Sequence, residues 1–181
     1  PDGSTCVSSI AYGKEDKIYY FIAGPKYDSR QRFDTGCWKD YIIEYDLSKE
    51  RFKYVFVDIY RAHFRTTQTS TDREISLDTS LVPISVVRKE MLINGYDVNN
   101  NHIIISDNTQ EVEITRVNYN PTNSIDIYST EVDYDTTFVP ADTLLQCTER
   151  RLLNFDEDRY ISGINIIDGM IFWTDNYSKP K

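Results

Sequence analysis

The sequence lacks any long apolar run and any recognisable signal peptide. None of its 181 residues belongs to a stretch that approaches the roughly 20 apolar residues of a membrane-spanning helix. The N-terminus carries no basic and then apolar leader. We therefore expect no membrane-spanning segment.

Cysteine and histidine are also scarce. The three cysteines, Cys6, Cys37 and Cys147, form an odd set without C-x-x-C spacing, so we expect reduced thiols and assembly in a cytosol. Neither His63 nor His102 has a Cys or His neighbour at metal-ligand spacing, and each is expected to be a surface or loop residue. With no phosphate-binding loop or nucleophile elbow, the sequence predicts no catalytic site, metal or cofactor.

Positive charge is in the minority. The chain has 20 basic and 29 acidic residues, a net charge of −9, and its acids are spread throughout. Binding to nucleic acid or to an anionic membrane would need clustered Lys and Arg. An acidic surface in contact with water is the simpler interpretation.

The sequence is instead rich in residues that favour β-sheet. It contains 14 Tyr and only 7 Gly, and 13% of its residues are aromatic. Four consecutive strands are predicted at residues 6–12, 17–24, 40–46 and 51–59. Four antiparallel strands in a row form a meander, which is the unit of a β-propeller blade.

Details of these strands predict faces and turns. Phe52, Tyr54 and Phe56 alternate with other residues in the last strand, so they are expected to share one face. The carboxylates that end strands, at Asp46, Asp58 and Asp175, are expected to accept hydrogen bonds from backbone N–H groups and so to set turns.

A second, shorter copy of the first hairpin occurs near the C-terminus. Residues 162–175, "SGINIIDGMIFWTD", align with residues 8–23, matching Ile10 to Ile164 and Ile18 to Ile171. The predicted turns of this copy are the tight turn Asp168-Gly169 and the pair Asp175 and Asn176. The predicted blade core is Ile10, Ile18, Tyr20, Ile43, Phe56, Ile164, Ile166, Ile171 and Trp173.

The two copies are about a hundred residues further apart than one blade requires, so we expect a domain inserted between them. Short strand patterns and Asn-Gly turns in the insert predict a small β-barrel or sandwich. The expected organisation is a blade at 1–59, an inserted β-rich domain at 60–158, and the truncated start of the next blade at 159–181. Both ends look cut, so the chain is expected to be a fragment.

Two acidic stretches invite a metal-site interpretation. Asp97, Asn99 and Asn101 have the alternating spacing of a calcium loop, but His102 stands where that loop requires glycine. A β-turn is therefore expected there. The run Asp156–Asp158 is expected to be a solvated loop.

Two stretches carry a resemblance to a known family. Residues 159–181, "RYISGINIIDGMIFWTDNYSKPK", and the pattern within residues 6–59, "SSIAY…KIYYFIAG…DYIIEYDLSKERFKYVFVDI", resemble β-propeller virion proteins of short-tailed bacteriophages, including crAss-like phages. These proteins are called muzzle, nozzle, tail hub or stabilisation proteins. Gly169 departs from the family phrase, which has an acidic residue at that position.

The resemblance implies a structural role and no enzymatic activity. It implies a subunit repeated as a homo-oligomeric ring around the DNA-ejection channel of the virion tail, assembled in the host bacterial cytoplasm. Its partners would be copies of itself, other phage tail proteins, and genomic DNA that passes without specific binding. An acidic channel would repel phosphates and let DNA slide.

Two other classes remain open. A receptor-type propeller that binds extracellular proteins has a similar Trp-Thr-Asp strand, but its disulfide-rich surroundings are missing here. A carbohydrate-binding or carbohydrate-cleaving propeller could use exposed Tyr and Trp faces, and a hydrolase would need a pair of carboxylates in its pocket.

Overall fold

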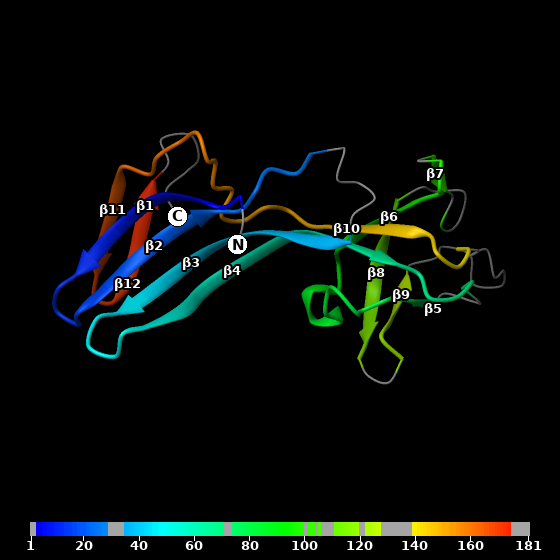
Figure 1. Cartoon of the computed structure of the whole chain (residues 1–181), viewed down its shortest axis with the longest axis horizontal. Coiled ribbons are helices and arrows are strands. Elements are labelled where there is room, and N and C mark those ends of the chain that lie inside the picture. The colour runs from blue at the N-terminus through cyan, green and yellow to red at the C-terminus, as the bar shows by residue number, and fades with distance from the viewer. Residues whose placement is uncertain are drawn as a thin grey trace. The chain divides into compact units, whose positions relative to one another are not determined.

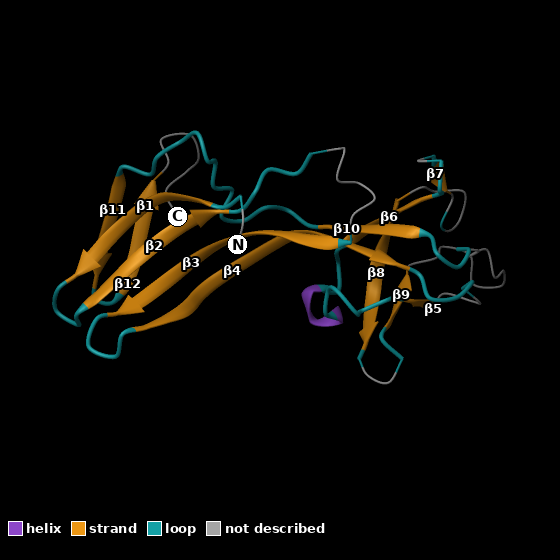
Figure 2. Cartoon of the chain, viewed as in Figure 1, coloured by secondary structure: helices purple, strands orange, loops and turns teal. Residues whose placement is uncertain are grey.

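The structure is a computed structural model, and it describes residues 3–28, 35–70, 74–99, 101–103, 105, 111–119, 122–127 and 139–174. These residues form antiparallel strands and one short 3-10 helix, Ile84–Val86 (Figure 2). The prediction of an all-β chain is confirmed. Among the described residues, no helix has the length and apolar character needed to cross a membrane.

The chain divides into two compact units, which are described separately. Unit 1 combines segments from both ends of the sequence and comprises Pro1–Lys26, Trp38–Asp58 and Arg151–Lys181. Unit 2 comprises Tyr27–Cys37 and Ile59–Arg150. The sequence interpretation placed the insert at 60–158, so its start lies one residue from the unit boundary and its end lies eight residues beyond it.

Unit 1 contains a four-stranded antiparallel meander in the order β1-β2-β3-β4 (Figure 1). The strands are β1 (Thr5–Tyr12), β2 (Lys17–Ala23), β3 (Gly36–Asp46) and β4 (Arg51–Arg65). All four were predicted from the sequence, the last of them from its alternating aromatic residues. Strand β4 is longer than predicted, and its residues from Ile59 onward belong to unit 2.

The turn between β3 and β4 is set by a carboxylate, as the sequence predicted. Asp46 Oδ1 accepts hydrogen bonds from the backbone N–H groups of Ser48 and Lys49, at 3.1 and 3.0 Å. These bonds satisfy donors that the turn would otherwise leave unpaired.

A separate hairpin in unit 1 consists of β11 (Gly163–Ile167) and β12 (Met170–Thr174). Its two-residue turn is Asp168-Gly169, and both residues have positive φ, 51° and 78°. Asp-Gly favours this conformation because glycine pays no steric cost there and aspartate tolerates it. The predicted turn Asp175 and Asn176 lies outside the described residues.

The core of unit 1 lies between the meander and this hairpin. Strand β11 lies close to β1 (Figure 1). The buried cluster consists of Val7, Phe21, Ala23, Ile42, Leu153, Phe155 and Ile161, and the residues packed against it are Ile10, Tyr19, Ile164, Ile171 and Trp173. The hairpin therefore covers one face of the meander.

The segment that leads into the hairpin is anchored to the meander by polar contacts. Arg151 donates two hydrogen bonds of 2.6 Å to the buried carboxylate of Asp40. The same carboxylate accepts from the backbone N–H groups of Gly24 and Phe155, each at 3.1 Å. Asp58 was predicted to end a strand and set a turn, but it lies within β4, and its carboxylate accepts the N–H of the distant Leu153 at 2.7 Å.

Unit 2 is a series of antiparallel strands, which begins with the last part of β4 and runs β4-β10-β6-β8-β9-β5. Its other strands are β5 (Glu74–Ser76), β6 (Leu92–Tyr96), β7 (His102–Ile103), β8 (Glu111–Asn118), β9 (Ser124–Ile127) and β10 (Leu144–Thr148), with β7 paired to β6.

The chain around β5, the last strand of this series, is hydrogen-bonded to the chain at the end of β4, the first strand. Thr66, which directly follows β4, forms an antiparallel bridge with Leu77 next to β5. Asp78 donates its N–H to the carbonyl of Arg65 at 2.7 Å, and Thr67 donates to Ser76 at 3.1 Å. The hydrogen-bonded path therefore returns to the end of β4.

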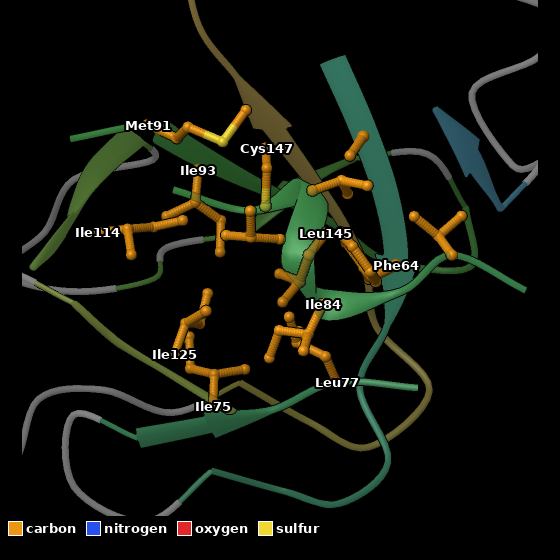
Figure 3. Packing of buried hydrophobic residues seen from close by; sticks show 14 of the residues in the cluster. Phe64, Ile75, Leu77, Ile84, Met91, Ile93, Ile114, Ile125, Leu145 and Cys147 are labelled. Carbon is orange, nitrogen blue, oxygen red and sulfur yellow. The ribbon is translucent and has the colours of Figure 1, made fainter. Parts of the chain in front are cut away.

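The core of unit 2 fills the space that these strands surround (Figure 3). Figure 3 labels Phe64, Ile75, Leu77, Ile84, Met91, Ile93, Ile114, Ile125, Leu145 and Cys147, all of which are buried. Side chains from every part of the strand series meet there. Unit 2 thus has a hydrophobic core of its own.

Candidate functional site

The two hairpins that resemble each other in sequence can be compared in register. The β1–β2 turn is closed by the pair Tyr12 and Lys17, and the β11–β12 turn by Ile167 and Met170. Counted from these closing pairs, Ile171 is equivalent to Ile18, as predicted, and Trp173 is equivalent to Tyr20.

The predicted match of Ile10 to Ile164 is wrong by one residue. Four residues lie between Tyr12 and Lys17, and two lie between Ile167 and Met170. Because the second turn is two residues shorter, Ile164 is equivalent to Ser9. A one-residue shift moves a side chain to the other face of a strand, so the correction changes which faces correspond.

The face of the hairpin that packs on the meander carries Ile164, Ile166, Ile171 and Trp173, since Ile164 pairs with Trp173 and Ile166 with Ile171. It contacts the meander face that carries Ile10, Tyr19, Phe21 and Ile42, which we call the inner face. Phe21 meets the ring of Trp173 at 5.6 Å between centroids.

The opposite face of the meander is apolar and aromatic. The cross-strand pairs Ile18–Tyr45 and Tyr20–Ile43 lie on it, and the ring centroid of Tyr45 is 4.6 Å from that of Phe52. We define the aromatic face as Ile18, Tyr20, Ile22, Ile43, Tyr45, Phe52 and Tyr54. None of these side chains is an acid or a base at neutral pH, and Phe52 and Tyr54 are 67% and 56% exposed.

Three predicted blade-core residues, Ile18, Tyr20 and Ile43, belong to the aromatic face and are only partly buried. Phe56, also predicted as core, is 43% exposed in this chain. The other five, Ile10, Ile164, Ile166, Ile171 and Trp173, lie between the meander and the hairpin. The sequence pattern identified apolar positions but not which of the two sheet faces is covered.

A groove of about 590 Å³ lies beside the hairpin in unit 1. Its lining is Tyr19, Ile42, Glu44, Lys53, Val55, Phe56, Leu152, Leu153, Gly169, Ile171 and Trp173. Glu44 is the single carboxylate in this lining, and Tyr19 donates a 3.0 Å hydrogen bond to it. Burial, reinforced by this bond, raises the pKa of Tyr19 to about 12. The lining therefore does not supply the carboxylate pair of a hydrolase.

The acidic run Asp156–Asp158 has a partner that the sequence did not reveal. Lys26 lies within 3.7 Å of Asp156, 3.2 Å of Glu157 and 2.6 Å of Asp158. Hydrogen bonds from Lys26 to Asp158 and Glu157 raise the pKa of Lys26. The positive charge beside this acidic loop is therefore the side chain of Lys26, which lies more than a hundred residues away in the sequence.

The calcium-like stretch forms the expected turn. Asp97 accepts hydrogen bonds from the backbone N–H groups of Asn99 and Asn101, each at 2.8 Å. The bonds from Asn101 are the main cause of the lowered pKa of Asp97. Among the residues that the structure describes, no group of three or more potential metal ligands occurs.

The prediction for one histidine is wrong. His63 is fully buried in unit 2, where its ring meets that of Tyr27 at 5.5 Å between centroids. His102 is exposed, as expected. His63 is buried because β4 runs on to Arg65 and pairs with β10, a strand that the sequence analysis did not identify.

A scan against protein-family models gives no match, and searches of curated proteins and of solved structures find no similar protein. The surfaces of unit 1 are therefore interpreted from their own geometry.

Proposed function

We propose that this chain is part of a structural subunit of the tail of a short-tailed bacteriophage, a muzzle, nozzle or hub protein that forms a ring around the DNA-ejection channel. The observation that carries the proposal is the stacking of a repeated hairpin on the meander that it resembles. Trp173, at the position of Tyr20, packs on Phe21 and Phe155. Consecutive blades of a propeller stack their sheets in this way.

In this proposal the meander is one propeller blade, and β11–β12 is the first hairpin of the next. Repeated sheets share one core between neighbours, since no sheet buries both faces alone. The groove beside β12 supports this view, because it leaves the inner face open over β3 and β4 at Ile42, Glu44 and Val55.

We further infer that unit 2 is a small closed barrel carried between the two blades. The bridge between Thr66 and Leu77, together with the strand order from β4 to β5, supports closure. Closure protects strand edges from pairing with other chains. A barrel of this kind can be inserted in a blade connection without disturbing the sheets of the propeller.

The charge of the chain suits a channel that does not retain DNA. Its net charge is −9, and several of its basic side chains are paired with acids, including Lys17, Lys26, Lys49 and Arg151. Repulsion between carboxylates and phosphates would limit adhesion during ejection.

The direct test is the composition of purified phage particles. Quantitative mass spectrometry of virions should find this chain at a fixed number of copies per tail. Antibodies against unit 2 should label the tail. Absence from particles would overturn the proposal, and so would secretion of the chain as a monomer that cleaves glycans.

A further inference from the structure

We propose that the edge of β4 at residues 51–57, in unit 1, is a docking site for an extended acidic segment of another protein, which adds to the meander as a further strand. The inference rests on one feature of the proposed function, the place of β4 as the outermost strand of a blade. Blades of a propeller stack through the faces of their sheets, so stacking leaves the outer edge of the last strand free.

The edge is open along seven residues. Strand β4 pairs with β3 on one side (Figure 1), and its pairing with β10 on the other side covers residues 61–65 only. Among the residues that the structure describes, no strand pairs with residues 51–57 on that second side. All seven residues are exposed. The backbone N–H and C=O groups of such an edge can pair with another chain.

The open part begins where partners from within the chain end. The carbonyl of Tyr60 accepts the N–H of Glu149 at 2.9 Å, directly before the pairing with β10. The carboxylate of Asp58 accepts the N–H of Leu153 at 2.7 Å. The returning chain thus contacts β4 as far as residue 58, and the edge that precedes this residue is the part that we assign to a partner.

The sequence of this edge suits an added strand. Residues 51–57, "RFKYVFV", are mostly aromatic or β-branched and contain neither glycine nor proline. Many edge strands are protected by proline or by short length, whereas β4 has 15 residues. The backbone of this segment can therefore accept a partner along its whole length.

Charge decides which partner fits. Arg51 and Lys53 are the only charged residues of the segment, so a basic edge stands in a chain whose net charge is −9. Pairing with the same edge of a second copy would bring four basic side chains together, and lysine on an edge commonly prevents such pairing. An acidic segment would instead place carboxylates beside Arg51 and Lys53, and cross-strand pairs of opposite charge stabilise a sheet.

The test uses the 181-residue chain and three synthetic peptides. The acidic peptide TEVEVEVT carries carboxylates at alternate positions, and the basic peptide TKVKVKVT has the same pattern with the opposite charge. The third peptide, TEVPVEVT, contains a proline that removes a hydrogen-bond donor from the added strand. Hydrogen exchange followed by mass spectrometry locates the bound peptide, and fluorescence anisotropy of labelled peptides measures affinity.

The acidic peptide should slow exchange of backbone amides within residues 51–57. It should leave residues 61–65 unchanged, because β10 already pairs with them. The Kd of the acidic peptide should lie below about 1 mM, and the basic and proline-containing peptides should each bind at least about tenfold more weakly.

Reversing the charge of the edge should reverse its preference. The variant that combines Arg51→Glu with Lys53→Glu should bind the basic peptide more tightly than the acidic one. The matched control combines Lys14→Glu with Lys89→Glu, which changes the net charge equally at two exposed lysines outside β4, and it should keep the preference for the acidic peptide. Circular dichroism verifies folding. If the reversed variant does not fold, Arg51→Gln with Lys53→Gln replaces it and should bind both peptides equally.

Three results would overturn the inference. The first is an acidic peptide that leaves exchange in residues 51–57 unchanged, and the second is equal affinity of the wild-type chain for the acidic and basic peptides. The third is slower exchange in residues 51–57 as the concentration of the chain rises without peptide, which would make a second copy the occupant. None of these results bears on whether the chain occurs in virions, so failure of the docking site and failure of the proposed function are distinguishable.

Discussion

Phe21 of β2 and Trp173 of β12 meet edge to face, with ring centroids 5.6 Å apart and planes at 69°. Phe155 lies against both rings, at 5.8 Å from Phe21 and 6.3 Å from Trp173. Edge-to-face pairs contribute about 0.5–1.5 kcal/mol beyond the burial of their area. This group of three rings joins the two ends of the sequence into one core.

Replacing Trp173 with alanine should therefore destabilise unit 1. The indole is only partly buried, so we expect a loss of about 2–4 kcal/mol in the free energy of unfolding, toward the lower end for aromatic truncations. Urea denaturation followed by circular dichroism, at concentrations where the chain is monomeric, measures it. Phe172→Ala is the control, since Phe172 lies on the opposite side of β12 and should cost under about 1 kcal/mol. Equal losses in the two variants would contradict the packing described.

Gly24 should not tolerate a side chain. A Cβ at this position would lie 1.9 Å from the carbonyl oxygen of Lys39, and a backbone atom cannot move aside as a side-chain tip can. We expect Gly24→Ala to lower the unfolding free energy by about 2–3 kcal/mol, as overpacking does elsewhere. A Cβ at Gly13 would have no neighbouring atom within 4 Å, so Gly13→Ala should change stability by no more than about 0.5 kcal/mol. Similar melting temperatures for the two variants would argue against the close approach.

Local patterns in the sequence predicted the strands of the meander and the Asp168-Gly169 turn, because alternation and turn chemistry act over a few residues. They also predicted that Asp46 accepts backbone hydrogen bonds in a turn, but they wrongly placed Asp58 at a strand end, since it lies within β4 and accepts from Leu153. The covered face of the meander was not predictable in this way. Aromatic residues occur on both faces, and only the position of the hairpin decides which face is buried.

The remaining misses depend on contacts between residues far apart in the sequence. The ion pairs of Lys26 with Asp156–Asp158 and the burial of His63 beside Tyr27 leave no local pattern. Strand β10 is only five residues long and was not predicted, and its place is set by its pairing with β4 and β6. The register of the second hairpin relative to the first was also mispredicted. An alignment of apolar positions does not show that the second turn is two residues shorter than the first.

The ion pair of Asp40 and Arg151 should stabilise unit 1 through the segment that it anchors. The Asp40 side chain is fully buried, and Arg151 is 28% exposed. Asp40→Asn leaves the guanidinium without its counter-charge, which should cost about 2–4 kcal/mol, somewhat below the value for fully buried pairs. Asp156→Asn removes a carboxylate from a solvent-exposed pair and should cost at most about 1 kcal/mol. Thermal unfolding of both variants measures the difference. A cost for Asp40→Asn as small as that for Asp156→Asn would show that the ion pair does not contribute to the stability of unit 1.

Asp46 should make stability depend on pH in the acid range. Hydrogen bonds from Lys49 and Ser48 lower its folded-state pKa below the usual value near 4. A lowered folded-state pKa contributes stability above the unfolded-state pKa, and this contribution is lost as pH falls through the folded-state value. The difference in the free energy of unfolding between wild type and Asp46→Asn should therefore be largest at pH 7 and should shrink below about pH 4. The corresponding difference for Glu50→Gln, in the same turn, should stay small throughout, and a constant difference for Asp46→Asn would contradict the assignment.

The three free thiols should react in the order of their exposure. Cys6 is exposed and Cys37 partly buried, whereas Cys147 is enclosed in the core of unit 2, where burial raises its pKa to about 12. Since the thiolate is the reactive form, a thiol reagent at pH 8 should modify Cys6 rapidly and Cys147 only when unit 2 opens. Cys6→Ser should abolish the fast phase, and Cys147→Ser should leave it unchanged. Rapid modification of Cys147 in the folded chain would show that the core in Figure 3 is open to solvent.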